Sequence, residues 1–133
     1  MLSSTADYAL RAVLFLGASY GKDPVRADEI ANATGAPHNY LAKTLNALAK
    51  SGVVASSRGP AGGFTLAVDP ADLVLARIID LFDEPKPHSQ CLLGIKPCDP
   101  QSPCAAHARW TEIVRGARAP LTSTTVADLL GAA

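Results

Sequence analysis

Hydrophobic positions along this chain form segments whose spacing changes from helical to strand-like. Residues 8–18 are apolar on nearly all sides apart from Arg11, which predicts a helix that other helices cover. The run from Ser4 to Asp7 has the form of a capping box, a hydroxyl followed three residues later by a carboxylate, so we expect this helix to begin at Ser4. The break from Gly21 to Pro24 ends it.

Two further helices are predicted next, joined by a tight turn. Residues 27–34 carry acids in their first turn and stop at Gly35, which can adopt the left-handed conformation that ends a helix. The next helix has Pro37 in its first turn and stops at Ser51 and Gly52. Its buried stripe is predicted to be Tyr40, Leu41, Thr44, Leu45, Leu48 and Ala49. Two helices joined in this way make a helix-turn-helix.

A β-hairpin is expected after the helix-turn-helix. Residues 53–57 and 64–68 are short β-prone runs, and the glycine-rich residues 58–63 separate them. This hairpin is in the position of a wing. Residues 69–72 then turn into a helix predicted over 73–82.

The last part of the chain is again helical in pattern. A helix is expected over 105–119, Pro120 interrupts it, and hydroxyls at 122–125 supply caps for a short final helix. The longer helix has an apolar stripe that needs a partner, formed by Trp110, Ile113, Val114 and Ala117. The predicted fold is mainly α with a small β-hairpin wing: a winged helix-turn-helix followed by a long C-terminal dimerisation helix.

Charge is balanced over the whole chain but unevenly distributed. The 133 residues have a formal net charge of zero, yet no acidic residue occurs between Ile30 and Val68, where Lys43, Lys50 and Arg58 lie. One face can therefore accept phosphate. The amino terminus has no basic leader, and no apolar run approaches the roughly 20 residues of a membrane span. We expect a cytoplasmic protein with no membrane partner.

The second helix of a helix-turn-helix lies in the major groove, with its amino end against the DNA. The candidates for contact there are His38, Asn39, Tyr40 and Lys43. Asn39 has the amide pair that can bind adenine, although it could instead cap the helix, and Tyr40 could instead pack inward. In the wing, Arg58 suits the negative potential of a narrow minor groove. The wing lacks the Gly-x-x-x-x-Gly-Lys pattern of a phosphate-transfer loop.

The three cysteines of the chain, Cys91, Cys98 and Cys104, fall within one short segment, and His107 follows. Cys104 and His107 are three residues apart, so both side chains can lie on one helical face. Zinc would accept these donors, but no Cys-x-x-Cys turn is present, and the wider gaps suit an iron–sulfur cluster. Free or disulfide-bonded cysteines are the alternative, although the odd count and the absence of an export signal argue against a disulfide framework.

Several of these segments together resemble the Rrf family of winged-helix regulators, over almost the whole chain. They are the run Asp7-Tyr8-Ala9-Leu10-Arg11, the pair Tyr40-Leu41 in the helix-turn-helix, the wing Arg58-Gly59-Pro60-Ala61-Gly62-Gly63, and the cysteine segment. The resemblance implies a homodimer on a double-stranded DNA operator. It adds Tyr8 and the wing residues Gly59, Pro60, Gly62 and Gly63 to the expected DNA-binding residues.

The segment from Cys104 to Trp110 resembles the IscR-like branch of that family, in which three cysteines and a histidine hold a [2Fe–2S] cluster. The implied ligands are Cys91, Cys98, Cys104 and His107, with a [4Fe–4S] cluster as the alternative. Six residues separate the first two cysteines, where five are usual in the family. In the NsrR-like branch the fourth ligand is an acidic residue of the partner subunit, and Asp7 of the partner subunit is the matching alternative to His107.

We therefore expect a dimeric DNA-binding transcriptional regulator, a repressor and not an enzyme, whose operator affinity depends on a cluster that senses iron–sulfur status, redox or nitric oxide. The expected parts are a DNA-binding domain over 1–84, a cluster-binding loop over 85–104, and a dimerisation helix with a short final helix over 105–133. One alternative keeps the DNA-binding module with a cluster-free thiol or zinc switch. Another is a small iron–sulfur redox protein, which would leave the wing without a role.

Overall fold

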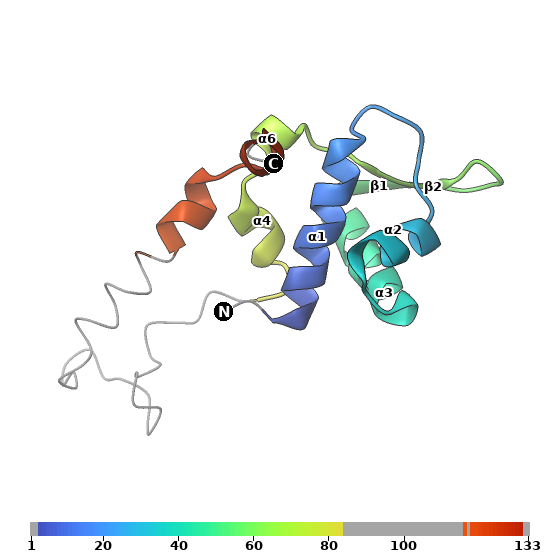
Figure 1. The fold of residues 1–133 in the computed structure, drawn as a ribbon, viewed down its shortest axis with the longest axis horizontal. Coiled ribbons are helices and arrows are strands. Elements are labelled where there is room, and N and C mark those ends of the chain that lie inside the picture. The colour runs from blue at the N-terminus through green and yellow to red at the C-terminus, as the bar shows by residue number, and fades with distance from the viewer. Residues whose placement is uncertain (1–2, 84–115, 117, 132–133) are drawn as a thin grey trace, which may run out of the picture.

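The computed structural model describes residues 3–83, 116 and 118–131 of the chain (Figure 1). Its elements are α1 (Ser4–Ala18), α2 (Ala27–Thr34), α3 (His38–Lys50), β1 (Val54–Ser57), β2 (Gly63–Leu66), the 3₁₀ turn η1 (Pro70–Asp72), α4 (Leu75–Ile79) and α6 (Val126–Gly131). Residues 118–123 are also helical. The described chain is mainly helical with one two-stranded hairpin, which confirms that part of the predicted fold class. The long C-terminal dimerisation helix predicted over 105–119 lies largely outside the described residues.

Helix α1 begins at Ser4, as predicted, but the residue that caps it lies one position earlier than expected. Ser3, not Ser4, is the N-cap, and its hydroxyl accepts a hydrogen bond from the amide of Ala6 at 3.1 Å. The predicted capping box between Ser4 and Asp7 is therefore wrong. Ser3 is held outside the helix because its own amide donates to Oδ2 of Asp83 at 2.8 Å, and its backbone is extended.

The turn between α2 and α3 follows the prediction closely. Gly35 has φ of 76° and ends α2 in the left-handed conformation, as expected. Pro37 lies one position earlier than expected: it is the N-cap of α3 with an extended ψ of 137°, so the helix begins at His38. Its carbonyl accepts the first helical hydrogen bond, from Leu41 at 2.9 Å. Helix α3 ends at Ser51 as predicted.

The core surrounds α1, which lies between α4 on one side and α2 and α3 on the other (Figure 1). Large side chains that are fully buried there include Leu16, Ile30, Leu41, Leu45, Leu48, Leu73, Ile78 and Val126. The predicted stripe of α3 is confirmed at Leu41, Thr44, Leu45 and Leu48. Tyr40 is an exception, since 40% of its surface remains exposed.

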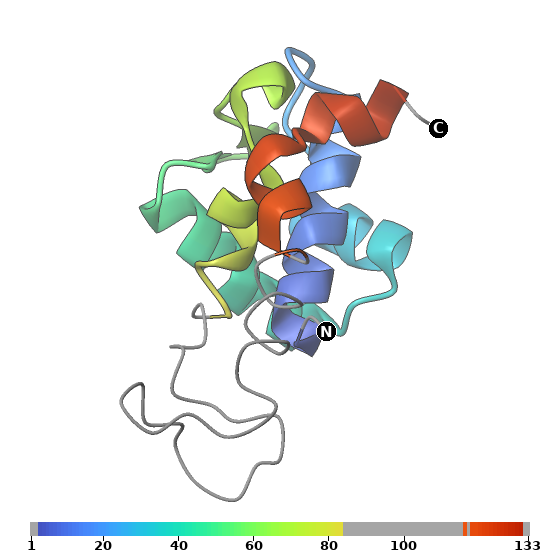
Figure 2. The same cartoon turned by 90° about the vertical axis from the view of Figure 1, so that its left-hand side faces the viewer.

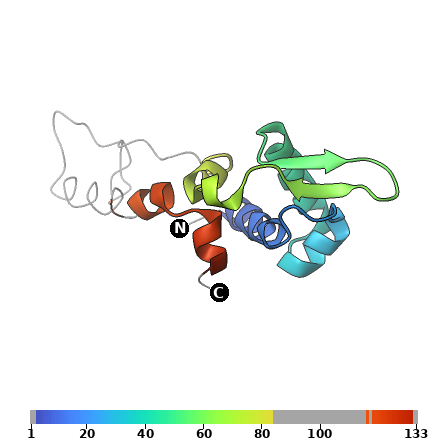
Figure 3. The same cartoon turned by 90° about the horizontal axis from the view of Figure 1, so that it is seen from above.

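Strands β1 and β2 pair antiparallel, with Val54 opposite Leu66 and Ser57 opposite Gly63. The hairpin projects beyond the helices, as a wing does (Figure 3). A third segment joins it, because Val25 and Phe64 exchange two backbone hydrogen bonds, at 2.9 and 2.7 Å. The wing is thereby fixed to the chain two residues before α2.

Helix α4 is shorter than the predicted helix over 73–82. Leu73 and Val74 are extended because their backbone pairs with the chain ahead of α6: the amide of Val126 donates to Leu73 at 2.8 Å, and the amide of Leu75 donates to Thr124 at 2.9 Å. These backbone groups cannot also form a helical turn. The predicted helix is therefore wrong in its first two residues and beyond Ile79.

The C-terminal residues return to the first helix. Pro120 does not interrupt the helical turn of residues 118–123, which corrects the prediction, because its carbonyl still accepts a hydrogen bond from Thr124 at 2.9 Å. Helix α6 lies across the C-terminal end of α1 (Figure 2). The apolar stripe from Trp110 to Ala117 lies outside the described residues. Within the described ranges, no helix has the length and apolar character needed to cross a bilayer.

Candidate nucleic-acid interface

The outer face of α3 is the first part of the candidate interface. Because the stripe of Leu41, Leu45 and Leu48 faces the core, the opposite face of the helix is turned to solvent. Its exposed residues are His38, Asn39, Tyr40, Ala42, Lys43, Asn46 and Lys50. All four residues predicted for this helix are among them. Ala42, Asn46 and Lys50 were missed, although the same helical spacing that predicted the buried stripe identifies them.

Asn39 and Lys43 lie one turn apart on this face. Both are exposed, and within the described part of the chain neither side chain has a hydrogen-bond or ion-pair partner. Helix α3 has no side-chain cap, so Asn39 does not take the capping role that was its alternative. The amide of Asn39 and the ammonium of Lys43 are therefore both available to a ligand.

His38 is engaged within the protein. Its Nδ1 lies 3.2 Å from Oδ1 of Asp28, which connects the first residue of α3 to the first turn of α2. Both side chains are more than half exposed, so the contact contributes little to folding. It does orient the imidazole at the amino end of α3.

Tyr40 and Tyr8 contact each other. Their rings meet edge to face, with centroids 5.8 Å apart and planes at 78°, and the hydroxyl of Tyr40 is hydrogen-bonded to the hydroxyl of Thr5. Tyr40 thus joins the first turns of α1 and α3. This contact agrees with the inward-packing alternative for Tyr40, while 40% of its surface stays exposed beside Asn39.

The wing tip carries the second part of the interface, with Arg58 exposed at its start. The amide of Gly62 donates to the carbonyl of Gly59 at 2.9 Å, which closes a turn with Pro60 in its second position. A Cβ on Gly62 would overlap the carbonyl of Ser57. Glycines are therefore required here by the backbone of the wing itself, before any DNA is considered.

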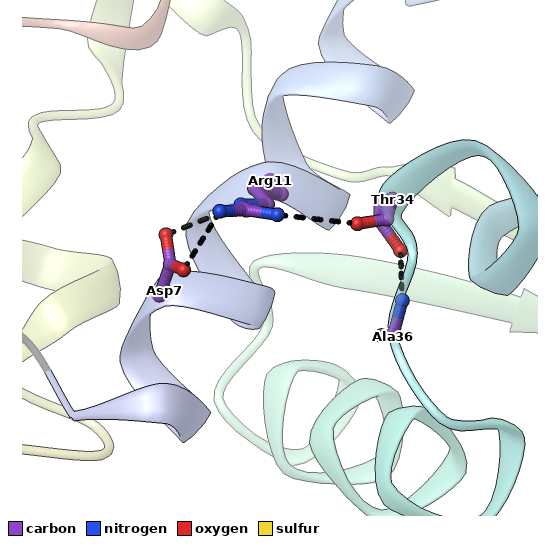
Figure 4. Close-up of polar contacts among 4 residues, drawn as sticks. All are labelled: Asp7, Arg11, Thr34 and Ala36. Atoms are coloured by element: carbon purple, nitrogen blue, oxygen red, sulfur yellow. Dashed lines mark hydrogen bonds and ion pairs between the residues drawn. The ribbon is translucent and has the colours of Figure 1, made fainter.

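A polar chain of contacts connects α1 to the turn between α2 and α3 (Figure 4). The guanidinium of Arg11 donates to Asp7 through Nε at 3.2 Å and pairs with it through a terminal nitrogen at 3.0 Å. Its other terminal nitrogen donates to the carbonyl of Thr34 at 3.4 Å. The hydroxyl of Thr34 in turn accepts from the amide of Ala36, also at 3.4 Å. Asp7, the alternative cluster ligand, is thus bound to Arg11 in this chain.

The four predicted cluster ligands, Cys91, Cys98, Cys104 and His107, lie outside the residues that the structure describes. Among the residues that it does describe, no three His, Cys, Asp or Glu side chains come close enough to hold a metal ion. The donor set itself suits a cluster, because thiolates are the usual ligands of iron–sulfur groups and imidazole replaces some of them in certain centres.

The chain is similar to known transcriptional regulators. A family model for Rrf2, described as an iron-dependent transcriptional regulator, matches residues 2–132. An HTH-type transcriptional regulator of Aquifex aeolicus is 35% identical over 132 residues, which covers 98% of this chain and 91% of the relative. The regulator IscR of Photorhabdus laumondii is 30% identical over 97% of this chain and 78% of the relative.

Solved structures with the same fold include two regulators. CymR of B. subtilis, described as the global cysteine regulator, superposes with a TM-score of 0.84 and 25% identity, over 100% of this chain and 98% of that one. IscR of T. potens superposes with a TM-score of 0.80 and 27% identity, over 99% of this chain and 87% of that one. These relatives are regulators and not enzymes, which confirms the expectation from the sequence.

Proposed function

The chain belongs to the Rrf2 family of DNA-binding transcriptional regulators, and we propose that it is a homodimeric repressor whose operator affinity is set by an iron–sulfur cluster. The observation that carries the DNA-binding part is the placement of two unpartnered polar groups, Asn39 and Lys43, on the exposed face of α3, with Arg58 on the adjoining wing. The fold joins the helix-turn-helix to the wing, because Val25, two residues before α2, is hydrogen-bonded to Phe64 of the wing.

The proposed division of labour on DNA follows from these positions. Helix α3 enters the major groove, where Asn39 reads base edges and Lys43 neutralises phosphate. Arg58 and the backbone of Gly59, Pro60, Gly62 and Gly63 approach the minor groove. His38, Tyr40 and Tyr8 contact the backbone of the DNA. Asp28 holds His38 in position, and Thr5 holds Tyr40 through its hydroxyl.

The proposed cluster ligands are Cys91, Cys98, Cys104 and His107. Three thiolates and one imidazole supply the charge and the soft donors that a [2Fe–2S] group requires, and a [4Fe–4S] group remains the alternative. The cluster, when bound, supplies redox- and nitric-oxide-sensitive chemistry. The relatives named IscR support this assignment, as does the description of the family as iron-dependent.

Asp7 of the partner subunit is the alternative fourth ligand, and the contacts of Asp7 give that alternative a consequence. A carboxylate bound to iron shares its negative charge with the metal, which weakens its two contacts with Arg11. Arg11 also binds the carbonyl of Thr34, at the end of α2. Ligation through Asp7 would therefore alter the contacts of Arg11 at the turn that precedes the recognition helix.

We place the DNA-binding domain at 1–84, the cluster-binding loop at 85–104 and the dimerisation helix with the final helix at 105–133. Two protomers related by a dyad would bind a symmetric operator in the cytoplasm.

The test compares operator binding by cofactor-loaded and stripped protein, each prepared without oxygen and with its absorption spectrum recorded. We expect stoichiometric iron and sulfide in the loaded form and affinities that differ by about tenfold or more between the two forms. Arg58→Ala should weaken binding by both forms. Equal affinities would remove the sensing mechanism and leave the DNA-binding assignment intact.

A second candidate keeps the same DNA-binding module with a thiol or zinc switch in place of a cluster. It is favoured by the likeness to CymR, whose described role is the regulation of cysteine. Oxygen-free isolation discriminates between the two. A colourless protein that contains only zinc, or no metal, supports this second candidate, whereas visible charge-transfer absorption supports the cluster.

A further inference from the structure

The end of α4 is joined to the C-terminal part of the chain by an ion pair with two hydrogen bonds. One terminal nitrogen of Arg118 donates to Oδ1 of Asp80 at 2.6 Å, and the other terminal nitrogen donates to Oδ2. About two thirds of each side chain is buried, with exposed fractions of 33% and 32%. A guanidinium that binds both carboxylate oxygens is fixed in direction as well as in distance.

This Asp80–Arg118 pair differs from the other ion pairs of the described residues. Arg11 and Asp7 are four residues apart on one helix, and His38 and Asp28 are ten apart and largely exposed. Asp80 and Arg118 are 38 residues apart and the most buried of the three pairs. The hydrogen bonds to Asp80 raise the pKa of Arg118 above its usual range, and its positive charge is retained at any pH in the physiological range.

The position of the pair in the sequence gives it a further consequence. Asp80 and Arg118 stand on either side of the stretch that contains Cys91, Cys98, Cys104 and His107. In addition to this pair, backbone hydrogen bonds join Leu73 to Val126 and Leu75 to Thr124. The described residues on the two sides of this stretch are therefore joined at one place, and the Asp80–Arg118 pair is one of the contacts that join them.

The same place is connected to α1. Asp83, three residues after Asp80, accepts a hydrogen bond from the amide of Ser3, the N-cap of α1, at 2.8 Å. The first turn of α1 carries Thr5, which is hydrogen-bonded to Tyr40 of α3. A change at the base of the cysteine-containing segment is thus adjacent to contacts that reach the recognition helix.

We propose that Asp80 and Arg118 are a positioning pair that holds the two ends of the cysteine-containing segment together and thereby strengthens cofactor retention. The proposal rests on the proposed cluster function. Its physical basis is conformational entropy: four ligands must converge on one group, and less freedom is lost on binding when the ends of the segment are already fixed. Removing the pair changes none of the four ligands, but it increases the conformational entropy that is lost when they converge on the cluster.

The experiment measures the decay of visible absorption after a chelator is added to reconstituted, full-length protein without oxygen. Arg118→Gln and Asp80→Asn should each shorten the lifetime of the cofactor by about fivefold relative to the wild-type protein. The double reversal Asp80→Arg with Arg118→Asp should recover part of it. Arg77→Gln, which removes an exposed arginine of the same helix, is the matched control and should leave the lifetime unchanged.

A second readout is independent of the cofactor. In stripped protein, trypsin cleavage after Arg109 should be faster in Arg118→Gln than in Arg77→Gln, because the segment is then held at one fewer point. Ile30→Val is the control for general destabilisation, since it removes one buried carbon atom from the core at α2, away from this place. Shortened lifetimes in Ile30→Val equal to those in Arg118→Gln would overturn the positioning role.

The cluster function and the positioning pair can be disproved separately. A wild-type protein that takes up no iron or sulfide on reconstitution contradicts the proposed cluster function. A wild-type protein that carries the cluster, with the same lifetime in Arg118→Gln and Arg77→Gln, contradicts the positioning pair alone.

Discussion

Gly63 is a residue at which the wing tolerates little change. Its φ is 154°, and an added Cβ would lie 2.5 Å from the carbonyl oxygen of Val25. Gly59 also has positive φ, at 100°, but an added Cβ there would meet nothing within 4 Å. At Gly63 a side chain is disfavoured by steric overlap and by the backbone conformation. At Gly59 only the backbone conformation disfavours it.

We predict that Gly63→Ala lowers the free energy of unfolding by about 3 kcal/mol, through strain and overlap together. Gly59→Ala should lower it by about 1 kcal/mol, through strain alone. Urea denaturation followed by circular dichroism measures both. Equal losses in the two variants would show that the contact with Val25 relaxes at little cost.

Lys43 provides the second test at the scale of one residue. Lys43→Ala should weaken operator binding by about tenfold at low salt and reduce the slope of log affinity against log salt by about 1, because one phosphate contact is lost. Arg77→Ala removes a positive charge from α4, on the far side of α1 from α3 (Figure 1), and serves as the control. A salt slope unchanged in Lys43→Ala would exclude the phosphate contact.

Single residues were predicted well where local geometry decides their role. Gly35 had to stop α2, and Leu41, Leu45 and Leu48 had to be buried, because helix spacing and left-handed backbone are local properties. The N-cap of α1 was assigned one residue too late, since Ser3 and Ser4 both offer a hydroxyl. The choice depends on Asp83, which binds the amide of Ser3 from 80 residues away in the sequence.

Among the elements, α6 has the clearest capping interaction. The amide of Asp128 donates to the hydroxyl of Thr125 at 3.1 Å, and the carboxylate of Asp128 accepts from the amide of Thr125 at 2.9 Å. The hydrogen bond from the backbone amide of Thr125 first, and then the interaction of its side chain with the carboxylate, hold the pKa of Asp128 below its usual value. The hydroxyl caps expected at 122–125 are thereby confirmed at Thr125.

The lowered pKa fixes how this cap depends on pH. The folded state binds the proton less tightly than the unfolded state, so the stabilisation is present above the unfolded pKa and is lost as the pH falls through the folded pKa. We predict that Asp128→Asn lowers the melting temperature at pH 7 and that its difference from wild type shrinks below about pH 4. Thermal denaturation over that pH range measures it. A difference that stays constant with pH would contradict the charged cap.

The elements that local pattern misjudged are those whose backbone has a distant partner. Residues 73–82 have helical spacing, yet Leu73 and Val74 pair with the chain before α6. No periodicity in either segment signals this pairing. Pro120 was likewise predicted to interrupt the helix because it has no amide hydrogen, although its carbonyl still accepts a helical hydrogen bond. The wing was predicted as a hairpin, but its third partner at Val25 has no turn signal to reveal it.

At the scale of the whole molecule, α6 completes the core that α1 begins. Val126 is fully buried, and Gly17 of α1 lies where an added Cβ would be 3.1 Å from both Val126 and Leu130. The absence of a side chain at Gly17 lets the two helices approach closely. The C-terminal helix is thus packed with the same core as the helix-turn-helix.

We predict that Val126→Ala destabilises the protein by about 2 kcal/mol and that α1 and α3 unfold together with α6 in one transition. Hydrogen exchange of the amides of α1 and α6, measured together, provides the check. Asn46→Ala, on the exposed face of α3, should leave the stability within about 0.5 kcal/mol of wild type. Protection lost in α6 alone would show that this helix is an independent unit.

The candidate interface was predictable as far as local pattern extends. The helix-turn-helix, the exposed Asn39 and Lys43 and the glycine-rich wing were all read from spacing and turn chemistry. The contacts between elements were not, because the pairing of Tyr40 with Thr5 and of Arg11 with Thr34 depends on how the helices cross. The cysteine segment was recognised by its donors, and its geometry stays a prediction.

The two backbone hydrogen bonds between Val25 and Phe64 fix the distance between the wing and the helix-turn-helix within each protomer. The proposed contacts of α3 and of Arg58 with DNA therefore lie at a set separation within one protomer, and a bound cofactor would change that separation little. In the proposed dimer, only the distance between the DNA-binding domains of the two protomers can change. We therefore expect cofactor state to select operators by the spacing of their half-sites, which a series of operators with lengthened centres would reveal.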